Sequence, residues 1–523
     1  MNVWQWLKRQ WGGSPTQPAD HAAAPLAPRP DVHSRDTAAP PPATEPKASR
    51  PPSVRAGKVP RLRSGKAAAA AARRRRPVVA ALPADLLQFS SQPTGVPIDV
   101  VVGFDFGTSS AKVAMQTHYF GKRVVMIDFD ALGHESCTYL LPACLYQCTA
   151  TTYSLDAPRG AFEHRRHLKL GLLGEIRTGD DPDPDHGTTA WAVAFVAVAL
   201  REARRRFLEG QAETYTGQPL RWAMNLGIPS AGYDDDKIQD RFLMVARAAW
   251  CASLRPAVNT KTVEAALVAV NEGSADDVPI AVVPEVVAEM VGYAKALLYR
   301  RPGLHVVFDI GASTLDICGI ELFAMDGDDN YELLTTDVRD MGFLELHQRR
   351  MLAVEHRAPF DAVPADIVAP LTGLFGLPDE LSEKLRRCDQ KYVEDAAAVL
   401  LRTLTLLRRW RAPGSPAWRD GLPLFVTGGG TDSPLVKRII QLAHERAKSV
   451  WVTYHSLDDK KLPMDVAVGP YGSELQRMAV AYGLSFPAIN IGTIKPPHEI
   501  PDVEPQPMVR RDWQHAYVDK DAV

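Results

Sequence analysis

Two short stretches of the chain, 204 positions apart, share one unusual pattern. Residues 101–106 and 305–310 are each a run of apolar, β-favouring residues that contains one aspartate near its end, Asp105 in the first and Asp309 in the second. A turn of small and hydroxyl residues follows each run, and a second apolar run follows each turn. Small residues let backbone N–H groups approach a phosphate closely. The pattern predicts two hairpins that face one another around a phosphate-bearing ligand.

A third, glycine-rich segment follows later in the chain. Residues 424–427 form a hydrophobic run that leads into three consecutive glycines, after which a helical segment begins near Pro434. A strand, a glycine-rich turn and a helix N-terminus together suit close approach to a flat base and its sugar. One hairpin alone is weak evidence, because similar turns join many ordinary strands. The three segments together indicate a nucleotide site.

These segments, in this order, resemble the superfamily of actin, the DnaK-type (Hsp70-like) heat-shock chaperones and the sugar kinases. Residues 105–112 resemble its first phosphate loop, 309–316 its second and 428–434 its adenosine loop. Residues 284–293 and 477–484 are similar to its first and second connecting helices. The resemblance implies an α/β, two-lobed actin-like ATPase fold, in which duplicated ribonuclease-H-like domains enclose a nucleotide cleft.

Within the superfamily, the heat-shock branch is the most similar. Residues 226–233 resemble its Val-Pro-Ala-Tyr segment, and a long helix is expected from about Asp235. Residues 139–146 resemble its early Thr-Pro-Ser strand. The resemblance spans residues 98–487, which is the length of a complete chaperone nucleotide-binding domain.

The resemblance predicts lobe I at residues 98–300 and lobe II at residues 301–487. Residues 1–97 are rich in Pro, Ala and Arg, and we expect a disordered arm there. Residues 488–523 form a Pro-rich tail that is too short for the peptide-binding domain of a heat-shock chaperone. We therefore do not expect general peptide-holding activity.

The resemblance assigns roles to individual residues. Asp105 and Asp309 are expected to hold Mg²⁺ through water, and Lys112 to place its charge on a phosphate, as in actin. Glu285 is expected to orient or deprotonate the attacking water. The predicted nucleotide-binding residues are Gly107, Thr108, Ser109, Lys112, Gly311, Ala312, Ser313, Thr314, Gly428, Gly429, Gly430 and Thr431. The predicted activity is slow, Mg-dependent ATP hydrolysis.

Several assignments have alternatives. Glu285 follows Pro284, so it also suits the positive end of a helix dipole without any catalytic role. Asp316 either joins the site or only fixes its hairpin. Lys169, which follows a basic stretch, is a candidate for the phosphate-facing loop of related chaperones. The second phosphate loop has Ala312 and Ser313 where chaperones have glycines, and Asp432 replaces an adenine-packing arginine, so phosphate and base binding are both open to test.

The arm carries most of the positive charge of the chain. Residues 1–97 contain 15 Lys and Arg but only 5 Asp and Glu, whereas the whole chain has a net charge of −2. Residues 1–11 contain Trp4, Leu7 and Trp11 at helical spacing, a pattern that suits an anionic membrane surface or a partner groove. The basic cluster at residues 61–76 suits the same surface or a solvated linker, and we do not expect nucleic acid binding.

Six irregularly spaced cysteines indicate a reducing compartment, so we expect a cytoplasmic protein, with peripheral membrane contact through the arm as an open alternative. The leading interpretation is a chaperone-like, slowly hydrolysing ATP switch that controls binding to an unidentified protein partner. The alternatives are a nucleotide-binding scaffold without turnover and an actin-like, filament-forming ATPase. The sequence leaves the oligomeric state open.

Overall fold

The structure is a computed structural model of the chain. It describes residues 87–88, 94–117, 123–133, 137–148, 152–157, 162–178, 187–274, 278–296, 300–353, 379–431, 433–447, 452–455, 465–468 and 474–503. The Trp-rich start at residues 1–11, the basic cluster at residues 61–76 and Asp432 lie outside these ranges, so the expectations for them stay predictions.

The first lobe is built on a mixed sheet whose strands follow the order β15-β3-β2-β1-β8-β9, with β4 paired to β2. The strands are β1 (Ile98–Phe106), β2 (Ser110–Thr117), β3 (Arg123–Met126), β4 (Leu141–Pro142), β8 (Leu220–Ile228), β9 (Ile280–Pro284) and β15 (Asp465–Val468). The pairs β1–β2 and β2–β3 are antiparallel, whereas β1–β8 and β8–β9 are parallel. A smaller sheet of β5 (Cys144–Cys148), β6 (Thr152–Ser154) and β7 (Phe162–Arg166) follows β4.

The second lobe repeats this topology. Its sheet has the order β14-β13-β10-β11-β12-β16. The strands are β10 (Gly303–Ile310), β11 (Leu315–Met325), β12 (Asp328–Arg339), β13 (Leu422–Thr427), β14 (Val452–His455) and β16 (Thr493–Lys495). Again the first three strands pair antiparallel, and the fourth and fifth pair parallel beside the first. Two sheets with one shared strand order are duplicated ribonuclease-H-like domains, so the predicted two-lobed actin-like ATPase fold is confirmed.

Alternation along the two central strands decides which side chains face the space between the sheets. In β1, residues 98, 100, 102, 104 and 106 pack into the core of the first lobe, with helices α4 (Thr188–Tyr215) and α5 (Asp236–Ser253). In β10, residues 304, 306, 308 and 310 pack into the core of the second lobe. Because side chains alternate along a strand, Asp105 and Asp309 point to the opposite faces, toward the middle of the molecule.

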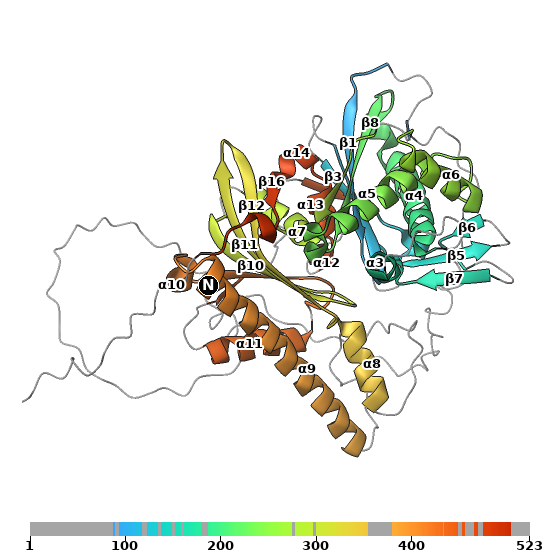
Figure 1. Cartoon of the computed structure of the whole chain (residues 1–523). Helices are drawn as coiled ribbons and strands as arrows, with labels where there is room; N and C mark the ends of the chain where they lie inside the picture. The colour runs from blue at the N-terminus through green and yellow to red at the C-terminus, as the bar shows by residue number, and fades with distance from the viewer. Residues whose placement is uncertain are drawn as a thin grey trace, which may run out of the picture. The chain divides into compact units, whose positions relative to one another are not determined.

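Two short helices fill that middle layer. Helix α7 (Glu285–Lys295) and helix α13 (Ala479–Leu484) pack against one another, and residues from both sheets join them in a third core. Figure 1 shows both helices between the β1 and β10 sheets. A Cβ atom on Gly483 would lie only 1.8 Å from the carbonyl oxygen of Ala288, so only glycine permits this close crossing. The two predicted connecting segments are therefore the helices that join the lobes.

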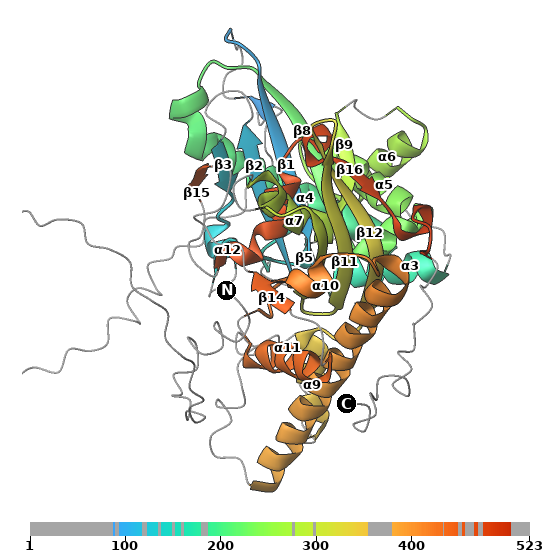
Figure 2. The ribbon, with the colours of Figure 1, turned by 90° about the vertical axis from the view of Figure 1, so that its left-hand side faces the viewer.

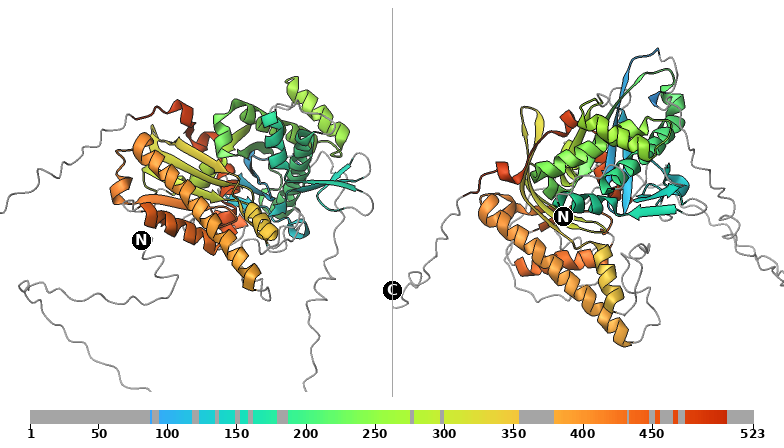
Figure 3. Two further views of the ribbon diagram at one scale, coloured as in Figure 1. Left: turned by 60° about the horizontal axis from the view of Figure 1, so that its bottom comes forward. Right: turned by 45° about the vertical axis from the view of Figure 1, so that its right-hand side comes forward.

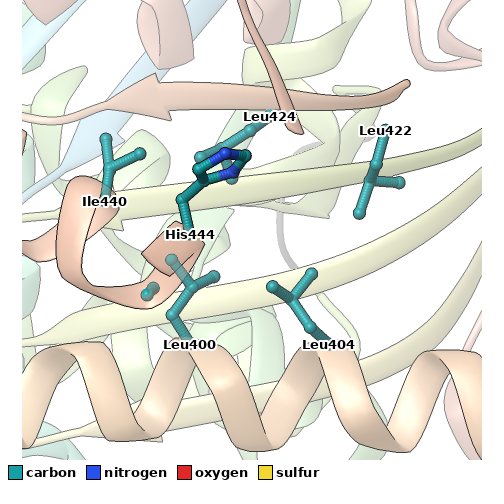
Figure 4. A pocket seen from close by; sticks show the side chains of 7 residues that line it. Leu400, Leu404, Leu422, Leu424, Ile440 and His444 are labelled. Atoms are coloured by element: carbon teal, nitrogen blue, oxygen red, sulfur yellow. The ribbon is translucent and has the colours of Figure 1, made fainter. Parts of the chain in front are cut away.

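Helices α8 (Phe343–Ala353), α9 (Asp379–Leu406) and α11 (Pro434–Ala447) cover the other face of the second sheet, with α11 against α9 (Figures 2 and 3). Leu400 and Leu404 of α9 face Leu422, Leu424 and Ile440 around a cavity of about 10 Å³ (Figure 4). A cavity of that size holds at most one water molecule. The apolar stripe of α9 is core packing and leaves no ligand site there.

The remaining helices are α3 (Leu168–Thr178), α6 (Thr260–Asn271), α10 (Ala417–Asp420), α12 (Glu474–Arg477) and α14 (Ala488–Ile491). Helix α5 begins one residue after the expected start near Asp235, whose side chain caps it by accepting a hydrogen bond from the Lys237 N–H. Among the residues that the structure describes, no helix is both long and apolar enough to cross a bilayer.

Three parts of the structure lie near the predicted domain boundaries. Strand β15 and helix α13 lie within predicted lobe II, but β15 pairs with β3 and α13 packs on β1. The expected tail at residues 488–523 begins with ordered structure, because β16 extends the second sheet beside β12 and the Val503 N–H bonds to the Trp410 carbonyl. Near the end of the expected arm, Gln88 exchanges two hydrogen bonds with the backbone of Leu220.

Candidate functional site

The first hairpin places two of the predicted residues directly opposite one another. The antiparallel register pairs Asp105 with Lys112. Lys112 Nζ lies 2.9 Å from Asp105 Oδ2, and the two side chains are 18% and 5% exposed. Gly107, Thr108 and Ser109 form the turn between β1 and β2 and are at least partly exposed. This hairpin therefore neutralises its own buried carboxylate.

The second hairpin has the same register and a different charge. Asp309 of β10 pairs with Asp316 of β11, so two acidic side chains occupy the positions that an acid and a lysine occupy in the first hairpin. Like charges directly opposite one another on two strands repel. The Thr314 hydroxyl donates a hydrogen bond to Asp316, which offsets part of this repulsion. The second hairpin therefore lacks the ion pair that the first hairpin has.

Helix α7 brings a further carboxylate to the two hairpins. Glu285 is its first residue, as predicted, and Lys169 of α3 holds it with two bonds, because Lys169 Nζ lies 2.6 Å from Oε1 and 2.7 Å from Oε2 of Glu285. Both side chains are nearly buried. The sequence offered Lys169 only as a candidate for a phosphate-facing loop, whereas the structure places it inside the carboxylate cluster, 116 positions from its partner.

Burial and mutual repulsion shift the pKa values of these groups. Burial, then the charge of Glu285, raises the pKa of Asp309 to about 7, and burial, then the charge of Asp309, raises that of Asp316 to about 8. The pKa of Glu285 is raised by burial, although Lys169 opposes the rise. Burial alone would lower the pKa of the Lys169 ammonium, but Glu285 raises it. Perturbed groups of this kind gather at functional sites more often than elsewhere.

Three buried polar atoms beside the second turn have no hydrogen-bond partner among the residues that the structure describes: Asp309 Oδ1, Asp316 Oδ1 and Ser313 Oγ. Buried polar atoms without partners are rare and call for an explanation. Mg²⁺ needs only one or two carboxylates, because water and phosphate oxygens complete its coordination. Among the described residues, no group of three or more His, Cys, Asp or Glu is arranged to hold a metal ion by itself. The donor set therefore fits a cation that arrives with a phosphate.

The glycine-rich turn closes against the second hairpin. Gly428 has a φ of +84°, and a Cβ atom there would lie 2.1 Å from Asp309 Oδ1. The Gly430 N–H donates a hydrogen bond to the Ile310 carbonyl, and Arg477 bonds to the Gly429 carbonyl at 3.5 Å. The predicted adenosine loop, Gly428 to Thr431, is therefore held beside the predicted phosphate loop.

The second phosphate loop has a structural partner that was not predicted from the sequence. The Gly342, Phe343 and Leu344 N–H groups at the start of α8 donate to the carbonyl oxygens of Ser313, Gly311 and Ala312 at 2.9, 3.1 and 2.7 Å. These bonds fix a loop that has fewer glycines than its chaperone counterparts. No signal in the sequence marked residues 341–344, because a short loop before a helix has no distinctive periodicity.

Glu289 is a second residue that the sequence analysis left without a role. It lies one helical turn after Glu285 on α7, is 4% exposed, and accepts a hydrogen bond from Thr427 Oγ1 at 2.8 Å. An available signal was the spacing: two acids at i and i+4 on an otherwise apolar helix share one face. With Glu289, five carboxyl groups and two ammonium groups form one cluster: Asp105, Glu285, Glu289, Asp309 and Asp316 with Lys112 and Lys169.

No known family model matches the sequence, and no curated protein matches it. Among solved structures, the chain is similar to a non-polymerising mutant of MamK bound to AMPPNP, with 14% sequence identity and a TM-score of 0.37. That match covers 75% of this chain and 98% of the MamK chain. The repeated strand order and the carboxylates between the two hairpins define the class: a protein with the two-lobed actin-like ATPase fold.

Proposed function

We propose that the chain binds ATP with Mg²⁺ between its two hairpins, hydrolyses it slowly, and uses the resulting change to control binding to a partner protein. The observation that carries this proposal is the cluster of five carboxyl and two ammonium groups, in which Asp309 and Asp316 each have an unpartnered buried oxygen. A buried excess of negative charge is costly unless a cation or protons compensate for it. A cation delivered with a triphosphate supplies that compensation.

Each part of the site would have a separate task. Asp105 and Asp309 would hold Mg²⁺ through water, and bound Mg²⁺ would neutralise phosphate charge. Lys112 would contact a phosphate oxygen, and Thr108, Ser109 and Thr314 would donate hydroxyl hydrogen bonds to others. The turn at residues 428–431 would approach the base and sugar. Phosphoryl transfer requires mainly this positioning and charge neutralisation.

Glu285 is the residue that we assign to the attacking water. Its carboxylate is bound on both oxygens by Lys169, so the lysine orients Glu285 and competes with any water for it. A base held in this way works only when the lysine moves toward another anion, such as a phosphate. This arrangement supports slow turnover. With slow turnover, hydrolysis and ADP release would switch the protein between two states, which is the DnaK-type behaviour that the sequence resemblance implies.

The same ion pair favours a second candidate function, a nucleotide-binding scaffold without turnover. If Lys169 never releases Glu285, ATP is bound but not hydrolysed. Both candidates leave the partner unidentified, and we propose that residues 1–11 and 61–76 make contact with it or with an anionic membrane surface. Filament formation is a further alternative, and sedimentation of the full chain with ATP tests it.

Single-turnover hydrolysis of Mg-ATP by the full chain tests the proposal. We expect Glu285→Gln to retain ATP binding and to lose about 100-fold or more in rate, as is typical when a general base is removed. Glu332→Gln is the matched control, because Glu332 pairs with Lys495 in the second sheet, outside the cluster. ATP binding without turnover in the wild type would favour the scaffold. A wild type that does not bind ATP would exclude both candidates.

A further inference from the structure

The two acids of α7 hold different lobes. Glu285, in the first turn, binds Lys169 of α3, which belongs to the first lobe. Glu289, in the second turn, accepts a hydrogen bond from Thr427, the last residue of β13 in the second lobe. Residues four positions apart lie one above the other on a helix, so the two contacts lie along one face of α7.

The Thr427 position connects Glu289 to two other parts of the site. In the parallel register of β10 and β13, Thr427 lies beside Asp309. The next residue is Gly428, whose backbone passes close to the Asp309 carboxylate. The end of β13 therefore links Glu289 to Asp309 and to the glycine-rich turn at residues 428–430. A movement of the Glu289 side chain would displace both through this strand end.

The surroundings of Glu289 disfavour the charged form of its carboxyl group. Burial, then the negative charge of Asp309, raises the pKa of Glu289 well above its ordinary value, and Glu285 and Asp316 add to the effect. The Cys318 thiol lies nearby in β11 and is itself buried. A neutral acid can keep the hydrogen bond from Thr427 without adding charge to the cluster. Glu285 differs, because its partner is the ammonium group of Lys169, whereas the partner of Glu289 within the described part of the chain is the hydroxyl group of Thr427.

We propose that α7 is a two-point tie in which Glu289 is a positioning residue: Glu285 holds the first lobe, Glu289 holds the end of β13, and the rigid helix passes movement from one to the other. The nucleotide dependence of this tie rests on the proposed function, because an arriving phosphate would draw Lys169 away from Glu285 and release the first turn of α7. The tie between α7 and β13 itself is present without nucleotide.

Hydrogen exchange of the full chain without nucleotide tests the tie. Thr427→Val removes the hydroxyl with little change in shape, and we expect exchange at residues 422–431 and in α7 to become about fivefold faster, the loss of one hydrogen bond. Thr427→Ser and Glu289→Gln keep a hydrogen-bonding group and should exchange at the wild-type rate. Thr403→Val is the control, because Thr403 is also buried in the second lobe and bonds only within α9. Unchanged exchange in a folded Thr427→Val protein would overturn the proposal.

A second measurement adds Mg-ATP and asks whether the lobes respond together. In the wild type we expect ATP to slow exchange both at the first hairpin, residues 105–112, and at residues 422–431. In Thr427→Val, protection of the first hairpin should persist and protection of residues 422–431 should fall by about half or more. Equal protection of both regions in Thr427→Val and wild type would contradict the coupling. If the wild type binds no ATP, the proposed function fails, and the nucleotide-free experiment still decides on the tie.

Discussion

The two hairpins have the same register around their turns, and they differ at one charged position. Seven residues after the strand aspartate, the first hairpin has Lys112 and the second has Asp316. In the first hairpin the aspartate is therefore paired, because Lys112 Nζ lies 2.9 Å from Asp105 Oδ2. The second keeps two carboxyl groups with raised pKa values and unpartnered oxygens. One backbone register thus holds an ion pair in the first hairpin and two carboxyl groups in the second.

Breaking the ion pair of the first hairpin has the largest expected effect on stability. Lys112→Met leaves Asp105 as a buried carboxylate without its partner, and we expect the free energy of unfolding to fall by about 3 kcal/mol. Urea unfolding at pH 7 measures the change. The double variant with Asp105→Asn should recover most of the loss, because no unpaired charge then remains. A double variant as unstable as Lys112→Met would show that the charge balance of this hairpin is unimportant.

Removing a charged group from the second hairpin is expected to increase the free energy of unfolding. The pKa of Asp316 is about 8 in the folded protein and about 3.8 ordinarily, so the folded state binds an extra proton between these values. Stability therefore falls as pH rises from about 4 to 8. Asp316→Asn removes this titrating group. We expect the substitution to stabilise the chain by on the order of 1–2 kcal/mol at pH 8 and to make the free energy of unfolding less dependent on pH. Equal slopes in wild type and variant between pH 5 and 8 would refute this account of the hairpin.

Bound Mg-ATP should remove part of the difference between the hairpins. Asp309, with a pKa of about 7, is charged at pH 8 and largely protonated at pH 6. We therefore expect saturating Mg-ATP to raise the melting temperature more at pH 8 than at pH 6, by about 2 °C. Thermal unfolding in both buffers checks this, with Asp309→Asn as the variant in which the difference disappears.

The hydroxyl groups of the two turns provide the smallest contrast. Thr108→Val should weaken ATP binding about threefold, as expected for one lost hydrogen bond. Thr314→Val should weaken it further, because Thr314 also donates to Asp316 and its loss leaves that carboxylate with less support. Titration of fluorescent ATP measures both affinities. Equal losses in the two variants would mean that the Asp316 contact has no influence on the ligand.

The fold could be predicted because the segments that carry the family resemblance are local. Each hairpin, the glycine turn and the apolar helix α7 can be recognised within about a dozen residues, and the resemblance that they carry in this order implies the two lobes. The partner of Glu285 could not be read in this way, since Lys169 lies 116 positions away and its basic neighbours point to a surface loop. The role of Glu289 could not be predicted for another reason. Its hydrogen-bond partner, Thr427, is brought beside it only by the fold.

Two short strands near the expected lobe boundaries carry little sequence signal for a related reason. Strands β15 and β16 have four and three residues, too few for alternation to distinguish a strand from a loop. Their pairing is decided by sheet edges that other parts of the chain build. The pairs β15–β3 and β12–β16 extend the two sheets, and no local sequence pattern predicts them.

Calorimetric titration of the full chain with ATP, with and without Mg²⁺, is the most direct test of the central claim that the two hairpins form one Mg-ATP site. We predict that the wild type binds ATP in a Mg²⁺-dependent way. In both Asp105→Asn and Asp309→Asn we predict a loss of about 100-fold in affinity, since each substitution removes one of the two carboxylates expected to hold Mg²⁺. Glu332→Gln should bind as the wild type does. Mg-ATP binding that survives both aspartate substitutions would contradict the account, because the nucleotide would then be held elsewhere.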